Sequence, residues 1–331
     1  MVAPKRFTSI LLRLSISIIL LFLFFKFNHI DIHELLQIIK SANKSILTLA
    51  FFVFLFNYVF CFYRWKMLLK AVNMNLYSSR LIRSFCGGIF FSLFLPSAIG
   101  GDFARSLDLA THTKRPREVV ATVLLDRLSG YVGLVIIVLF SSLLGWRLIK
   151  DNGIVLISAT LIIAILIIIL LVFFNNFLFY KVNKLLDSPN AGRIREAIKN
   201  LHEEMYVFRH HKKVILNNIL LSLLIQAISP IVFYITALSL GINKDITYYF
   251  IFLPIIGAIT LLPISMGGFG VRENTTAIFF AKAGIGEVSA GAMAILNSFF
   301  ILVYGLIGGL IYYALTVHHR RLQHHKSPQL Q

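Results

Sequence analysis

Six charged side chains lie within or beside the apolar stretches of this sequence: Asp102, Arg105, Asp126, Arg127, Arg272 and Glu273. Charges at membrane depth are costly, and they commonly mark binding or transport sites. Asp102 and Arg105 are three residues apart and would share one face of a helix. A planar guanidinium suits phosphate oxygens, so we predict that Arg105 and Arg272 bind an anionic ligand. The alternative is internal ion pairing that serves only the fold, Asp102 with Arg105 and Asp126 with Arg127.

Two copies of one motif contain the two candidate arginines. The pattern Leu-Pro-x-x-x-Gly-Gly-x-x-x-Arg occurs at 95–105 and again at 262–272. Its glycines would let backbone amides approach a ligand, and a helix that begins there would point its positive end at that ligand; they are Gly100, Gly101, Gly267 and Gly268. Because both copies follow an aromatic apolar run and precede a polar stretch, we interpret them as a duplication. Interrupted apolar segments at corresponding places in two halves are typical of a transporter binding site.

The composition places both motifs in a membrane. The 331 residues are 58% hydrophobic and only 14% charged, whereas soluble chains carry about 25% charged residues. This excludes a cytosolic enzyme, a disordered chain and a disulfide scaffold. The net charge of +18 would suggest nucleic acid in a soluble protein, but no nucleic-acid-binding pattern interrupts the apolar runs. Cys61 and Cys86 are predicted to be packing residues, with no metal site.

Six apolar segments are long enough to span a bilayer as helices of about 20 residues: 9–28, 45–63, 119–146, 153–174, 214–240 and 290–315. Two shorter runs, 81–95 and 246–262, each end before a proline. If both are re-entrant, 23 of the 32 Lys and Arg residues fall on one side, which the positive-inside rule makes cytoplasmic. We therefore predict an all-α polytopic membrane protein with six full transmembrane helices and two re-entrant hairpins in an inverted repeat.

The segments outside the bilayer are too short for a soluble domain, so residues 1–331 are predicted to form one integral membrane domain. Both termini would be cytoplasmic, in a cell membrane. The basic loop 175–213 is expected to be cytoplasmic and to contain an amphipathic helix, because its apolar residues recur on one helical stripe. The basic tail 316–331 would also be cytoplasmic. Gly305 and Gly309 form a small-xxx-small pair that predicts helix packing.

Arg64 and Trp65 open a basic segment, 64–83. An interfacial Arg-Trp pair is typical of a membrane anchor, and contact with a lipid headgroup is the alternative. Catalytic patterns are missing: the sequence has no Walker loop, serine elbow or Asp-x-Asp metal site. Gly100-Gly101-Asp102 matches the intramembrane aspartyl proteases only in part. We expect neither enzyme activity nor a cofactor or metal.

The charged residues and motifs together resemble one family, the flippase-like membrane domain of lysylphosphatidylglycerol synthases. The matching segments are Arg64-Trp65 with Leu68-Leu69, Leu95-Pro96 with Gly100-Gly101-Asp102 and Arg105, Asp126-Arg127-Leu128-Ser129-Gly130, and Pro263 with Gly267-Gly268 and Gly270-Val271-Arg272-Glu273. The likeness covers about residues 10–315. It implies a domain that moves anionic or aminoacylated phospholipid, or a polyprenyl-linked lipid, between leaflets. The chain stops at Gln331 without the soluble domain of those synthases, so lysyl transfer from tRNA is not expected.

The leading functional hypothesis is therefore a lipid flippase or scramblase, and the lipid headgroup stays open. The alternatives are a membrane-embedded transferase acting on a lipid-linked sugar and a non-transporting scaffold. A phospholipid or lipid-linked substrate is the expected partner, with a separate lipid-modifying enzyme as a further candidate. In the transport hypothesis Arg105 and Arg272 hold the lipid phosphate in turn. Asp102 and Glu273 would then keep the empty cavity from carrying bare positive charge.

Overall fold

The computed structural model describes residues 31–95, 99–150, 212–260 and 265–326, with shorter stretches within 15–26 and 153–168. Every element in the ten described ranges is a helix: α2 (Ile32–Ser41), α3 (Lys44–Ala71), α4 (Ser78–Ser92), α5 (Ile99–Thr113), α6 (Pro116–Leu144), α7 (Trp146–Ile149), α11 (Lys212–Ser239), α12 (Ile246–Thr260), α13 (Val271–Lys282) and α14 (Glu287–Lys326). This confirms the all-α prediction. The predicted spans 9–28 and 153–174 lie largely outside the described residues, and so does the loop 175–213.

Four of the described helices are long and apolar enough to cross a membrane: Lys44–Ala71, Pro116–Leu144, Lys212–Ser239 and Glu287–Val317. They coincide with four of the six predicted spans, and α12 is a shorter apolar helix. Large apolar side chains stay exposed on their outer faces, among them Phe52, Phe140 and Leu310. Such a surface is suited to contact with lipid acyl chains.

Local sequence signals begin two of these long helices. The side chain of Asn43 accepts hydrogen bonds from the backbone N–H groups of Ser45 and Ile46 and so caps the start of α3. Pro116 is the first residue of α6, where its missing N–H costs nothing. These signals set where the helices begin and therefore which residues reach the interior.

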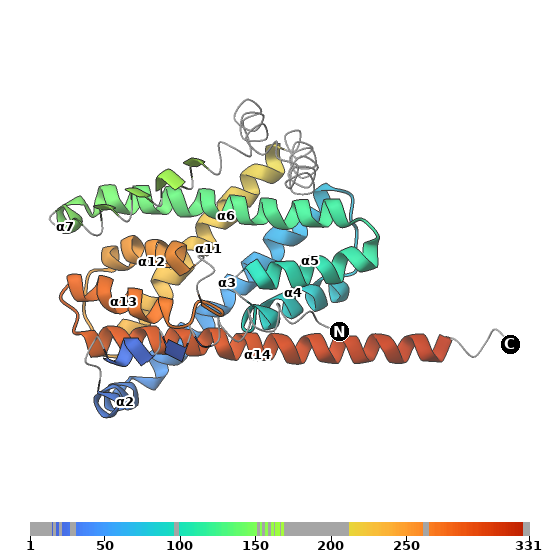
Figure 1. The fold of residues 1–331 in the computed structure, drawn as a ribbon. Coiled ribbons are helices and arrows are strands. Elements are labelled where there is room, and N and C mark those ends of the chain that lie inside the picture. Colours follow the sequence, from blue (N-terminus) through green and yellow to red (C-terminus); the bar gives the residue numbers. More distant parts are fainter. Residues whose placement is uncertain are drawn as a thin grey trace.

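The described helices form two units with corresponding packing, α3 to α6 and α11 to α14. The first helices of the units, α3 and α11, pack against each other. In each unit the second helix packs against the third, the third against the fourth, and the second also against the last helix of the other unit. In Figure 1, α6 and α14 lie on opposite sides, with α4 and α5 between them at one end and α12 and α13 at the other. This correspondence supports the duplication inferred from the two motifs.

The helix pairs α4–α5 and α12–α13 approach each other at their tips. The carbonyl oxygen of Leu93 lies 3.4 Å from the position that a Cβ on Gly267 would occupy. Leu93 also packs on α14, where a Cβ on Gly305 would lie 2.5 Å from its side chain, and Gly309 makes similar room for Phe90. The predicted packing role of Gly305 and Gly309 is confirmed.

Candidate functional site

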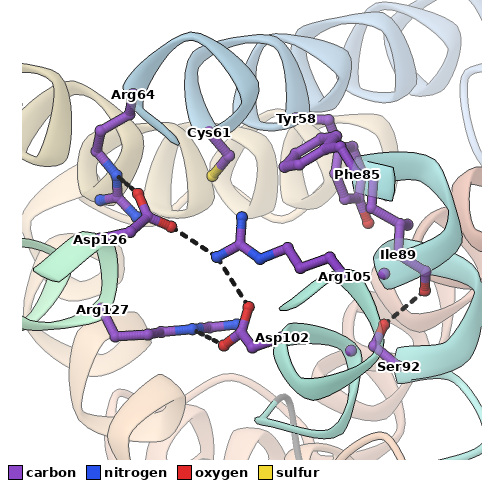
Figure 2. A pocket seen from close by; sticks show the side chains of 12 residues that line it. Tyr58, Cys61, Arg64, Phe85, Ile89, Ser92, Asp102, Arg105, Asp126 and Arg127 are labelled. Carbon is purple, nitrogen blue, oxygen red and sulfur yellow. Dashed lines mark hydrogen bonds and ion pairs between the residues drawn. The ribbon is translucent and has the colours of Figure 1, made fainter. Parts of the chain in front are cut away.

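Five of the predicted side chains form one continuous chain of ion pairs between α3, α5 and α6 (Figure 2). Arg64 Nε lies 2.6 Å from Asp126 Oδ1, and the second oxygen of Asp126 lies 2.8 Å from Arg105 Nη2. The same Arg105 nitrogen lies 2.9 Å from Asp102 Oδ1, and Asp102 Oδ2 pairs with Arg127 Nε. Three guanidiniums alternate with two carboxylates. The cluster therefore carries a net charge of +1.

The interpretation of Arg64 and Trp65 as an interfacial anchor is wrong. Arg64 is only 6% exposed and Trp65 is fully buried. The reason is that α3 turns this face toward α6, where Asp126 compensates the charge of Arg64. Trp65 instead supports the cluster, because the Arg105 guanidinium carbon lies 4.7 Å from the centre of its ring.

The alternative of internal ion pairing holds for Asp102 with Arg105, whereas the ion pairs of Asp126 and Arg127 are made with other residues. Neighbouring residues on a helix point in different directions, so Asp126 and Arg127 do not face each other. Asp126 turns toward Arg64 and Arg105, whereas Arg127 turns toward Asp102. The pairs therefore join three helices rather than neighbours on one.

The ion-pair cluster lines a cavity of about 170 Å³. The residues around it are Tyr58, Cys61, Arg64, Phe85, Gly88, Ile89, Ser92, Gly101, Asp102, Arg105, Asp126 and Arg127. Arg105 is 95% buried and uses one nitrogen, Nη2, for both carboxylates. Its Nε has no hydrogen-bond partner in the described part of the chain. An arginine held in place with an unused donor is suited to an anionic ligand.

The glycines of the first motif mainly pack the helix pair. Gly100 and Gly101 lie in the first turn of α5. A Cβ on Gly101 would overlap the carbonyl oxygen of Gly88 in α4, and one on Gly100 would overlap the side chain of Leu95. Gly101 lines the cavity but Gly100 does not. Gly100 was expected to let the backbone approach a ligand, but in the structure it allows close packing against Leu95 instead.

The glycines of the second motif form a turn instead. Gly267, Gly268 and Gly270 have φ of +58°, +79° and +84°, a left-handed conformation that other residues rarely adopt. The turn is secured by Glu273, whose Oε2 accepts a hydrogen bond of 2.6 Å from the N–H of Gly270. Backbone conformation, not helix packing, is what requires glycine here.

Arg272 and Glu273 do not pair with each other. Glu273 accepts a hydrogen bond from the hydroxyl of Ser298. Arg272 donates to the Gly267 carbonyl at 3.2 Å and to Ser298 at 3.4 Å. Among the described residues no carboxylate lies within 4 Å of Arg272. Glu273 therefore forms no direct ion pair with Arg272, although both side chains contact Ser298, and its second oxygen caps the start of α13.

Arg272 borders a second, smaller cavity of about 70 Å³. Its lining is mostly apolar, and its neutral polar members are Ser229, Thr260 and Asn297. The structure thus places one candidate arginine in each of two cavities. It does not bring Arg105 and Arg272 together in one site.

The sequence alone did not identify two residues that line the first cavity, nor a neighbouring group of ion pairs on α5. Cys61 and Tyr58 line the cavity from α3, about one and two turns before Arg64. Asp108 lies one turn beyond Arg105 on α5 and pairs with Arg80 at 3.3 Å and Arg83 at 3.4 Å. The spacing of Asp102, Arg105 and Asp108 at intervals of three was a usable signal, because it predicts one charged face on α5.

The described residues contain no group of three or more His, Cys, Asp or Glu side chains that could hold a metal ion. The family described as lysylphosphatidylglycerol synthase TM region matches residues 10–309, a range that includes both motifs and the whole ion-pair cluster. Comparisons with curated proteins and with solved structures give no match. This match and the four apolar helices make the chain a multi-pass membrane protein related to lipid metabolism or transport. It belongs to the lysylphosphatidylglycerol synthase transmembrane-region family.

Proposed function

We propose that this protein moves a phospholipid, or another lipid with an anionic headgroup, between membrane leaflets as a flippase or scramblase. The observation that carries the proposal is the buried Arg105, which lines a cavity of about 170 Å³ and whose Nε has no hydrogen-bond partner among the described residues. A buried donor without a partner is unfavourable. A lipid phosphate would accept a hydrogen bond from this donor while its acyl chains stay in the bilayer.

Arg105 is the central ligand of the proposed site. Its ring contact with Trp65 and its two ion pairs hold the guanidinium in position before the lipid arrives. The phosphate oxygens would accept hydrogen bonds from the nitrogens that the carboxylates leave unused. Gly101, Arg64 and Arg127 border the same cavity, so the headgroup would be surrounded by donors. Asp102 and Asp126 limit the positive charge of the empty site.

The proposal includes a topology in which the α4–α5 and α12–α13 pairs are re-entrant and enter from opposite faces. Their placement at opposite ends of α6 and α14 supports this (Figure 1). Basic residues support the orientation, because the α3–α4 connection, the α5–α6 connection and the end of α14 lie at one end of the molecule. That end would be cytoplasmic. An inverted repeat of this kind is an architecture of alternating access, in which Arg105 and Arg272 hold the phosphate in turn.

Leaflet exchange in proteoliposomes tests the function. Purified protein is reconstituted with a fluorescent phospholipid, and dithionite quenches only the outer leaflet. We expect Arg105→Ala to slow exchange roughly ten- to a hundredfold, the loss of one charge-assisted hydrogen bond. Arg115→Ala is a matched control, because the Arg115 side chain is 44% exposed and its ion-pair partner among the described residues is Glu118.

Two outcomes would contradict the proposal. Exchange at the parent rate in a folded Arg105→Ala variant would make the arginine structural. A donor-dependent product without any leaflet exchange would indicate the transferase on a lipid-linked sugar. The topology has its own test: a cysteine placed at Lys199 and labelled from outside intact cells would show that the loop 175–213 is not cytoplasmic.

A further inference from the structure

The two arginine cavities lie along one face of α3. Tyr58 lines the first cavity and Phe54 lines the second. These residues are four apart, so they are stacked one helical turn from each other on the same face. The two cavities are therefore about one helical turn apart along α3, and these two side chains border them.

The ring of Tyr304 contacts both of these rings, and we call Phe54, Tyr58 and Tyr304 the aromatic plug. The Tyr58 and Tyr304 ring centres are 5.3 Å apart, and Phe54 lies 5.4 Å from Tyr58 and 5.8 Å from Tyr304. Phe54 and Tyr304 are 9% and 8% exposed. Rings at these distances are in contact, so the plug is closed in this structure.

One member of the plug comes from the other unit. Tyr304 belongs to α14, and its hydroxyl donates a hydrogen bond of 2.8 Å to the carbonyl of Phe51 on α3. The next residue, Gly305, is where Leu93 at the tip of α4 packs. A movement of that tip would therefore act on α14 beside Tyr304. The plug lies where the two units and a hairpin tip meet.

We propose that the aromatic plug is the gate between the two arginine cavities, and that a headgroup passes from one to the other only when Tyr304 leaves Tyr58. This inference rests on the proposed transport function, and it adds the barrier that transport must open. The closed plug would keep the first cavity from opening to both sides at once. Two connected cavities that open to opposite sides of a membrane would otherwise leak water and ions.

The native Cys61 provides a direct test, because its side chain lines the first cavity. The chain contains two cysteines, so a Cys86→Ser background leaves Cys61 as the only thiol. A charged, membrane-impermeant methanethiosulfonate reagent is applied to right-side-out and to inside-out vesicles. We expect the parent to be labelled from one face only. With Tyr304→Ala or Tyr58→Ala, Cys61 should become reactive from both faces.

Tyr312→Ala is the matched control, since Tyr312 is also on α14 but packs against Phe91 and Gly87, away from the plug. It should keep one-sided labelling. Tyr304→Phe keeps the ring and should also stay one-sided, with a thermal melt showing that each variant is folded.

Three results would overturn the gate: two-sided labelling of the parent, one-sided labelling of both plug variants, or no labelling in any variant. The labelling needs no lipid movement. Two-sided labelling of the plug variants, with no leaflet exchange by the parent, would therefore keep the gate and reject the flippase. Leaflet exchange by the parent, with one-sided labelling of the plug variants, would keep the flippase and reject the gate.

Discussion

The two copies of the motif have the same glycines and arginine but use them differently. In the first copy the glycines lie inside α5 and let it pack closely against α4. In the second copy they lie in a left-handed turn before α13. The two arginines also differ in their partners. Arg105 is ion-paired to two carboxylates, whereas Arg272 has only neutral hydrogen-bond partners in the described residues.

This difference shows that a duplicated motif need not form duplicated sites. The carboxylates around Arg105 come from the motif itself, as Asp102, and from α6, as Asp126. In the second copy Phe269 takes the position of Asp102, and the nearby carboxylate of Glu273 caps α13. The two cavities therefore offer an anion different surroundings, one dense in charge and one mostly apolar.

The largest expected effect is on Asp126. Asp126→Asn removes the carboxylate shared by two buried arginines, and breaking a buried ion pair on one side costs about 3–5 kcal/mol. In the second copy Glu273→Gln removes only hydrogen bonds and should cost about 1–3 kcal/mol. Chemical unfolding in detergent measures both. Equal losses would mean that the two copies are held together in the same way.

A smaller effect is expected at the glycines. Gly101→Val would push α5 away from the Gly88 carbonyl, and overpacking of this kind costs about 1–3 kcal/mol. A Cβ on Gly268 would lie 3.1 Å from Arg272 Nη2, the end of a flexible side chain, but the residue must adopt a φ of +79°, which costs about 1–2 kcal/mol. A cross-over test separates the two causes: Gly101 should tolerate Ala better than Val, whereas at Gly268 both should be similarly destabilising. Thermal melts of the four variants decide between packing and backbone strain.

The arginines themselves should differ in their response to lysine. Arg105→Lys keeps the charge but cannot reach both carboxylates and a ligand through a planar fork, so we expect leaflet exchange to fall roughly tenfold. Arg272→Lys should lose less, since its partners are a carbonyl and a hydroxyl that an ammonium can also serve. The dithionite assay on both variants measures the ratio. A greater fall in leaflet exchange for Arg272→Lys than for Arg105→Lys would mean that the second cavity, not the first, is the more important for transport.

The smallest effect is expected for Ser298→Ala. The Ser298 hydroxyl donates to Glu273 and accepts from Arg272, and loss of a neutral hydroxyl typically costs about 1 kcal/mol. A shift in unfolding free energy near that size, with exchange close to the parent rate, would show that the second copy is held by ordinary hydrogen bonds. A loss as large as that of Asp126→Asn would contradict this. Thr316→Ala is a suitable control, because its hydroxyl bonds only to its own helix, at the Tyr312 carbonyl.

Much of the architecture follows from the sequence because its signals are local. Four of the predicted spans are helices in the structure, since a long apolar run determines a membrane helix without regard to its neighbours. The two breaks follow from proline and glycine. The pair of Asp102 with Arg105 follows from helical spacing alone. The repeated motif is visible as well, because the same pattern occurs at 95–105 and at 262–272.

Only the tertiary structure decided which charges meet. Arg64 and Asp126 are 62 residues apart, and no local spacing predicts that α3 and α6 bring them together. The same is true of the aromatic plug, in which Tyr58 and Tyr304 come from different units. A sequence shows which side chains are costly to bury, but their partners depend on how the helices cross. That crossing is set by close packing at glycines such as Gly88 and Gly101, where removing a single Cβ decides how near two helices can lie.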